Sequence, residues 1–132
     1  MSTTRGRLVY ANQVVHDQAD FFQPDGFTRV PGLTLAQLQM QVFFNNAPQP
    51  WHFVSGIGVT DAQVASGKVY WMEVPSTPGF YSIRWRPNAL GYWRVLITYP
   101  AGQQIMGQDY DVVLGGVTAD SGLRESFIKP SC

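Results

Sequence analysis

The sequence predicts an all-β domain in which antiparallel strands pack as a sandwich. Three observations support this fold class: apolar and polar residues alternate in several stretches, clusters of Gly, Pro and Asn separate those stretches, and helical periodicity is nearly absent. About seven short strands spaced by such turns are typical of a sandwich or a barrel. The chain has 132 residues, a length that fits one domain. We expect the β-sandwich at residues 1–114, with 1–6 as a flexible N-terminal segment.

The first half of the chain contains three expected strands. Residues 7–10 and 51–54 are short strand candidates, whereas the pattern in 14–22 is undecided. A strand at 36–44 would place four apolar side chains on one face: Leu38, Met40, Val42 and Phe44.

Residues 34–41 also allow a helix, which Thr34 would cap. We favour the strand because the stretch runs directly into Val42 and its apolar neighbours. A turn is expected next, since Asn45 and Asn46 tolerate positive φ and Pro48 lacks a backbone donor.

The second half contains the clearest alternation. Strands are expected at 68–74, 79–87, 92–99 and 103–113, with a turn at 88–91 and a hairpin turn formed by Pro100, Ala101 and Gly102. The side chains expected to point inward are Tyr81, Ile83, Trp85, Trp93, Val95, Ile97, Tyr110 and Val112.

Residues 115–132 are interpreted as a C-terminal arm. Its apolar side chains Leu123, Phe127 and Ile128 flank Arg124 in an amphipathic pattern. These side chains cannot be buried well unless another surface receives them, and a neighbouring subunit is the natural receiver.

Composition disfavours several functional classes. Nine Lys and Arg residues balance nine Asp and Glu residues, so no net field attracts nucleic acid or an anionic membrane. Only 14% of residues are charged and another 14% are aromatic, which favours a surface that meets a partner. No secretory signal or transmembrane span is evident, so we expect the chain to be made and kept in the cytoplasm, or to leave it by a route that needs no signal. Cys132 is the single cysteine, and its pairing with another chain stays open.

The polar residues do not predict an active site, a metal site or a cofactor. His16 and His52 are isolated from other ligands, which favours structural or surface roles. Three carboxylates within 17–25 could hold calcium, but they lack the alternating ligand positions of a calcium loop, so a turn is favoured. A hydrolase or lyase would need carboxylates or histidines that only the fold could bring together. We expect a protein without enzymatic activity.

Most aromatic residues are expected in the core, because buried rings dominate apolar burial. Phe80 and Tyr92, with Tyr70 or Trp71, are the candidates for an exposed aromatic surface.

Three arginines fall on the outward phase of 79–87 and 92–99: Arg84, Arg86 and Arg94. On adjacent strands they would form a basic stripe, either solvated with cross-strand partners such as Glu73 or serving as a docking patch for an acidic partner.

Residues 79–87 and 91–99 together resemble the closing strands of bacterial and phage immunoglobulin-like domains. Those domains often have Gly-x-Tyr, a strand, Pro, Gly-x-Trp and a further strand, a pattern matched here by Gly79, Tyr81, Pro87, Gly91 and Trp93. The resemblance implies an immunoglobulin-like antiparallel β-sandwich, here with extended terminal arms.

A small β domain followed by an arm also resembles virion components of tailed phages, both capsid decoration proteins and tail or baseplate accessory proteins. That resemblance implies a structural protein of the virion that binds its own copies or other virion proteins. Capsid or tail position, copy number and strand order stay open. The alternative is a carbohydrate-binding module that holds host surface glycan on exposed aromatics.

Overall fold

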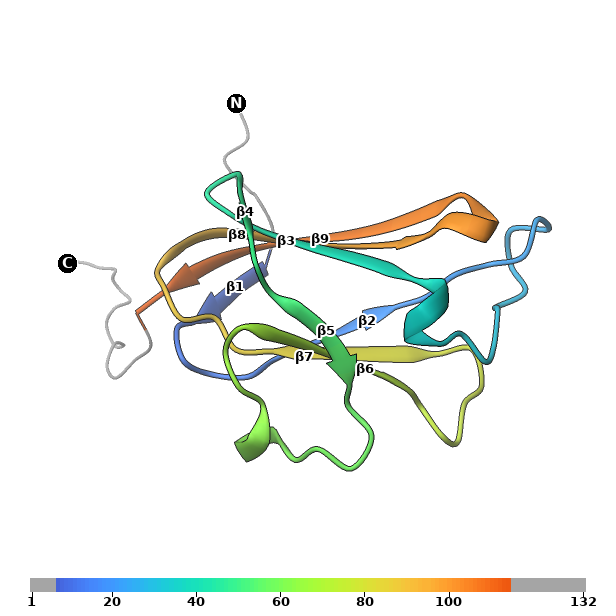
Figure 1. Ribbon diagram of the computed structural model, residues 1–132, viewed down its shortest axis with the longest axis horizontal. Helices are drawn as coiled ribbons and strands as arrows, with labels where there is room; N and C mark the ends of the chain where they lie inside the picture. The colour runs from blue at the N-terminus through green and yellow to red at the C-terminus, as the bar shows by residue number, and fades with distance from the viewer. Residues whose placement is uncertain (1–6, 115–132) are drawn as a thin grey trace.

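Two β-sheets packed face to face make up the part of the chain that the structure, a computed structural model, describes, namely residues 7–114 (Figure 1). The larger sheet has the strand order β1-β9-β8-β3-β4, and the smaller has the order β2-β7-β6-β5. The expected all-β sandwich is thereby confirmed.

The five-stranded sheet contains β1 (Arg7–Tyr10), β3 (Gln39–Phe44), β4 (Ala47–Gln49), β8 (Gly91–Tyr99) and β9 (Gln104–Val113). The four-stranded sheet contains β2 (Val15–Ala19), β5 (His52–Ser55), β6 (Lys68–Glu73) and β7 (Tyr81–Trp85). Three single turns of 3-10 helix lie between strands: η1 (Leu35–Gln37), η2 (Asp61–Gln63) and η3 (Pro100–Gly102).

The core consists of the side chains that alternation assigned to the inner faces. The eight residues expected to point inward along the last three strands are each at most 3% exposed. Aromatic rings fill the centre, where Trp85 meets Trp93 at 5.5 Å and Tyr110 at 5.0 Å between ring centroids. The Tyr110 hydroxyl donates to Asp17 at 2.7 Å, and burial is the main reason why the pKa of Tyr110 is raised.

The stretch around residue 36 contains both a helical turn and a strand. η1 begins after Thr34, whose backbone N–H donates to the side-chain oxygen of Gln37 at 2.9 Å. β3 begins only at Gln39 and pairs with β8. The strand predicted at 36–44 is therefore confirmed for 39–44. Residues 35–37 form a single helical turn, much shorter than the helix that 34–41 also allowed.

Parallel strand pairs correct the expectation of a purely antiparallel sandwich. β1 is parallel to β9, and β5 is parallel to β6. The parallel pairing of β5 with β6 follows a crossing between sheets. After β4, a strand that the sequence did not predict, the chain passes from the larger sheet to the smaller one (Figure 1). The turn at 88–91 also connects different sheets, since β7 and β8 belong to opposite layers.

Candidate functional site

The outer face of the five-stranded sheet exposes apolar side chains along most of its length. Alternation turns these residues outward, because their neighbours Val9, Trp93, Val95, Tyr110 and Val112 are buried. Leu8 is 61% exposed, Tyr10 44% and Ile105 69%. The other apolar members of this face are half-buried, namely Phe43, Tyr92, Leu96 and Val113.

Strand register organises this outer face into rows across the sheet. Phe43, Arg94 and Asp109 form one row, and Gln41, Leu96 and Gly107 form the next. A Cβ atom on Gly107 would lie 2.8 Å from Leu96 Cδ2, so the leucine side chain lies over the glycine. The absence of a side chain at Gly107 leaves room for the leucine.

An ion pair crosses the same face. Arg94 Nε donates to Asp109 Oδ1 at 2.7 Å, and Nη2 donates to Oδ2 at 3.2 Å. This bidentate contact with Asp109 raises the pKa of Arg94. The Arg94 Cζ atom also lies 6.0 Å from the centre of the Tyr92 ring. The charges of Arg94 and Asp109 cancel, so the pair adds no net charge to the face. Its two hydrogen bonds instead fix the positions of both side chains.

The outer face ends in a shallow hollow beside the end of β9. A volume of about 510 Å³ lies between the Asn45–Asn46 turn and the last residues of β9, with Tyr92 and Asp111 on its wall. Leu114, the last described residue, is 78% exposed at this end.

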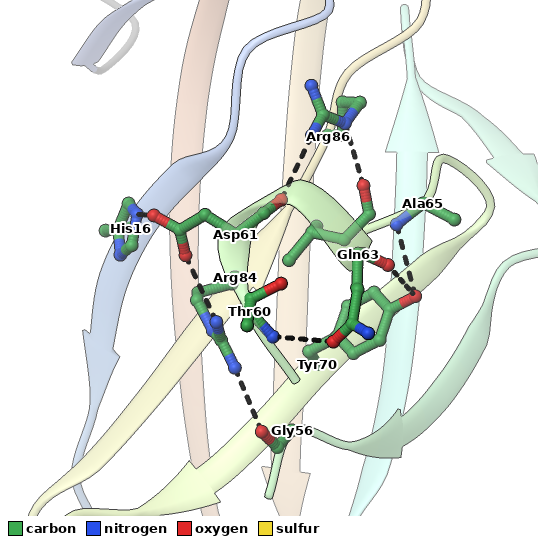
Figure 2. A network of polar contacts seen from close by, with 10 residues as sticks. His16, Gly56, Thr60, Asp61, Gln63, Ala65, Tyr70, Arg84 and Arg86 are labelled. Carbon is green, nitrogen blue, oxygen red and sulfur yellow. Dashed lines mark hydrogen bonds and ion pairs between the residues drawn. The ribbon is translucent and has the colours of Figure 1, made fainter. Parts of the chain in front are cut away.

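The outer face of the four-stranded sheet differs, because the loop of residues 56–67 is bonded to its side chains (Figure 2). Arg84 donates to the Gly56 carbonyl oxygen at 2.9 Å and to Asp61 Oδ1 at 3.1 Å. The Tyr70 hydroxyl accepts from the Ala65 N–H at 3.1 Å. Val64, in the same loop, is only 2% exposed.

These contacts correct the predicted basic stripe. Arg84 is buried, and Arg86 donates to the carbonyl oxygens of Val64 at 2.7 Å, Asn12 at 2.6 Å and Asp61 at 3.1 Å. Both arginines fasten loops, whereas Arg94 lies on the opposite sheet.

Glu73, suggested as a cross-strand partner of the arginines, has another role. Its carboxylate accepts from the backbone N–H of Gly79 at 2.8 Å and from that of Gly32 at 3.2 Å. The residue therefore ties two loops to β6.

The predicted aromatic surface is only partly present. Tyr70 and Trp71 are buried at 7% and 4% exposure, so neither offers a free ring. Phe80 is half-buried under Arg29, whose Cζ atom lies 3.8 Å from the ring centre. Tyr92, half-buried on the five-stranded sheet, is the only one of these four candidates on the apolar outer face.

Three of the remaining polar candidates have a local partner. His16 Nε2 lies 2.9 Å from Asp61 Oδ2, Asp20 lies 3.5 Å from Arg29, and Asp25 accepts from the N–H groups of Phe27 and Thr28. Within residues 7–114, no group of three or more His, Cys, Asp or Glu side chains is arranged to hold a metal ion. Over that same range, no helix is long and apolar enough to span a membrane.

The candidate residues of the C-terminal arm lie outside the described residues. They are Leu123, Arg124, Phe127 and Ile128, together with Cys132.

Comparison with known proteins does not assign the chain to a family. No protein-family model matches the sequence, and no match to a curated protein was found.

The sequence prediction missed most of the apolar outer face, although a signal for it was present. Leu8, Leu96 and Ile105 each stand on the polar phase of an alternating strand, opposite buried neighbours. An apolar residue on the wet phase of one strand is common and carries little information. Only the pairing of β1, β8 and β9 brings several of them onto one surface.

Proposed function

We propose that this chain is a structural protein of a phage virion, which binds its own copies or a neighbouring capsid or tail protein. The outer face of the five-stranded sheet and the C-terminal arm provide the contacts. One observation carries the proposal: this sheet face exposes a series of apolar side chains, while the chain's own 56–67 loop is bonded to the other sheet face. An extended apolar surface of this kind is typical of a binding site for another macromolecule.

The strand order supports the immunoglobulin-like part of the proposal. Variable-type immunoglobulin domains add strands to the sheet that contains the closing strands, and β4 likewise extends the sheet of β8 and β9, next to β3. The resemblance of residues 79–99 to phage and bacterial immunoglobulin-like domains supports a place in the virion. The proposal assigns the protein no enzymatic reaction, and its site of action is the assembled particle.

Sedimentation of the full chain, alone and with purified capsid or tail particles, tests this function. We expect the wild-type chain to self-associate or to bind particles, and Leu8→Lys or Ile105→Lys to reduce that association at least tenfold. Ile57→Lys is the matched control, because Ile57 is 76% exposed but lies in the 56–67 loop. Circular dichroism of each variant verifies that the sandwich is intact.

Two results would contradict the proposed interaction surface. One is a wild-type chain that neither self-associates nor binds any particle. The other is equal loss of association in Ile57→Lys and in the two sheet-face variants.

Glycan recognition is the second candidate, favoured by the hollow beside the ring of Tyr92. The side chains of Asn45, Asn46 and Asp111 line the same hollow, and amides and carboxylates with an aromatic ring are suited to sugar hydroxyls. Calorimetric titration with host surface glycans distinguishes the two functions. Binding that Tyr92→Ala abolishes, without any change in self-association, would favour the carbohydrate-binding module.

A further inference from the structure

We propose that the apolar outer face of the five-stranded sheet receives the arm of a second copy of this chain, through residues 123–128. This inference rests on the proposed function and narrows it to one occupant. The two copies would exchange arms reciprocally, so that each sheet face binds the segment of its partner.

The position at which the arm begins makes this contact geometrically accessible. β9 ends at Val113 beside the hollow, at one end of the apolar face. From Leu114 to Leu123 an extended chain spans at most about 30 Å, and the ten residues of β9 cover about the same length. The segment at 123–128 can therefore reach any part of a facing sheet.

The direction of β9 favours a second copy over the chain's own sheet. β9 runs towards Val113, so the sheet face lies behind the point where the arm leaves. An arm that covered its own face would have to reverse direction between Val113 and Leu123. An arm that continues forward moves away from its own face and towards a neighbour.

The size of the face supports a contact that combines sheet and arm. The five strands range from three residues in β4 to ten in β9, and at about 3.4 Å per residue and about 4.8 Å between strands they give a face of roughly 500 Å². A stable protein interface usually buries about 800 Å² on each partner. Because the face alone falls short, reciprocal arms would supply the remaining area on both sides.

Side-chain chemistry is complementary between the two surfaces. Leu123, Phe127 and Ile128 match the apolar rows of the face. In the arm, Arg124 and Lys129 balance Asp120 and Glu125, so apolar side chains rather than net charge would hold it on the face.

Complementation between two full-length variants tests the exchange. Ile105→Glu damages the face and leaves the arm intact, whereas Phe127→Ser damages the arm and leaves the face intact. Sedimentation should show each variant alone as a monomer, with self-association weakened at least tenfold. An equimolar mixture should recover a heterodimer, because one intact face meets one intact arm.

Matched controls separate this inference from the proposed function. Ile57→Glu and Ser121→Glu place the same new charge off the face and before the 123–128 segment, and both should assemble normally. If Phe127→Ser assembles like wild type while Ile105→Glu does not, the arm exchange is overturned but the binding face stands. A wild-type chain that binds particles but does not self-associate would also overturn the arm exchange and leave the binding face standing. An equimolar mixture of the two variants that stays monomeric would overturn the exchange as well.

Cross-linking through the single cysteine identifies which chain the arm touches. The full chain is labelled at Cys132 with benzophenone maleimide, and unlabelled and ¹⁵N-labelled copies are mixed before irradiation. The expected products join the arm of one isotopic form to peptides of β1 or β9 in the other. Products confined to single chains, or to peptides outside the five-stranded sheet, would overturn the proposal.

Discussion

At the residue scale, Arg84 shows how a side chain on the polar phase of a strand can become a structural anchor. It lies on the outward phase of β7, yet only 9% of it is exposed. The loop of residues 56–67 covers it and supplies a carbonyl oxygen from Gly56 and a carboxylate from Asp61 (Figure 2). The guanidinium thus replaces water at the buried carbonyl oxygen of Gly56, which would otherwise be unpaired.

Replacing this buried arginine should destabilise the domain. Arg84→Met removes the donor to the Gly56 carbonyl oxygen, and the free energy of unfolding should fall by about 1–3 kcal/mol. Arg94→Met is the matched control, because its ion pair with Asp109 lies on the exposed face and is screened by solvent. Urea denaturation measures both, and an equal loss in the two variants would contradict a structural role specific to Arg84.

Asp61 should make the stability of the domain sensitive to acid. Its hydrogen bond with Arg84, followed by the contacts of His16, lowers the pKa of this carboxyl group below the ordinary value. A lowered pKa in the folded state stabilises the protein above about pH 4, and that stability is lost as the pH falls through the folded value.

Asp61→Asn tests this linkage directly. Between about pH 5 and about pH 3, the free energy of unfolding should fall less steeply in the variant than in wild type. Asp25→Asn is the independent comparison, because hydrogen bonds from Thr28 lower the pKa of Asp25 in a separate turn. The two effects should therefore add in the double variant. Parallel pH profiles for wild type and Asp61→Asn would exclude a contribution from this group.

At the scale of elements, the β3–β4 hairpin depends on backbone conformation at two asparagines. Asn45 and Asn46 have φ values of 48° and 68°, the left-handed region that a two-residue type I′ turn requires at both positions. The two asparagines predicted the turn because this residue type tolerates positive φ, but they did not predict the strand β4 that follows it. β4 contains Pro48 and lies at the edge of the sheet, where a missing backbone donor is tolerated.

Substitutions at the second turn position should change stability in opposite directions. Asn46→Gly should raise the free energy of unfolding by a few tenths of a kcal/mol, roughly, because glycine prefers this region. Asn46→Ala should lower it by about 1 kcal/mol, because alanine resists positive φ. Asn88→Ala, in an exposed turn with ordinary φ, should change little. Thermal denaturation of the three variants checks the order, and a stabilising alanine at position 46 would contradict it.

Most strands were predictable from the sequence, β4 being an exception, whereas the pairing between strands was not. Alternation around Tyr81 and Trp93 depends on local residue order, so the inner faces of β7 and β8 were predicted correctly. Which strands lie side by side depends on contacts between distant segments, such as β1 with β9. The expected arginine stripe failed for this reason, because it assumed that β7 and β8 share a sheet.

At the scale of the whole molecule, the two outer faces differ in how the chain itself uses them. The four-stranded sheet is fastened to the 56–67 loop by side-chain hydrogen bonds of Tyr70, Arg84 and Arg86. The five-stranded sheet keeps Leu8 and Ile105 exposed. Tyr92 and Arg94, identified from the sequence as interface candidates, lie on this second face, and the larger apolar set around them emerges only from the pairing of three strands.

The parallel pairing of β1 with β9 also determines how the domain would respond to mechanical force. Arg7 pairs with Tyr110 and Tyr10 with Val113, so the first and last strands run side by side in the same direction. A pull that separates residue 7 from residue 113 would slide the two strands along each other. Shear of this kind loads the whole set of inter-strand hydrogen bonds at once, whereas peeling would break them one after another. A domain pulled at residues 7 and 113 should therefore resist unfolding more strongly than one pulled so that the strands peel apart.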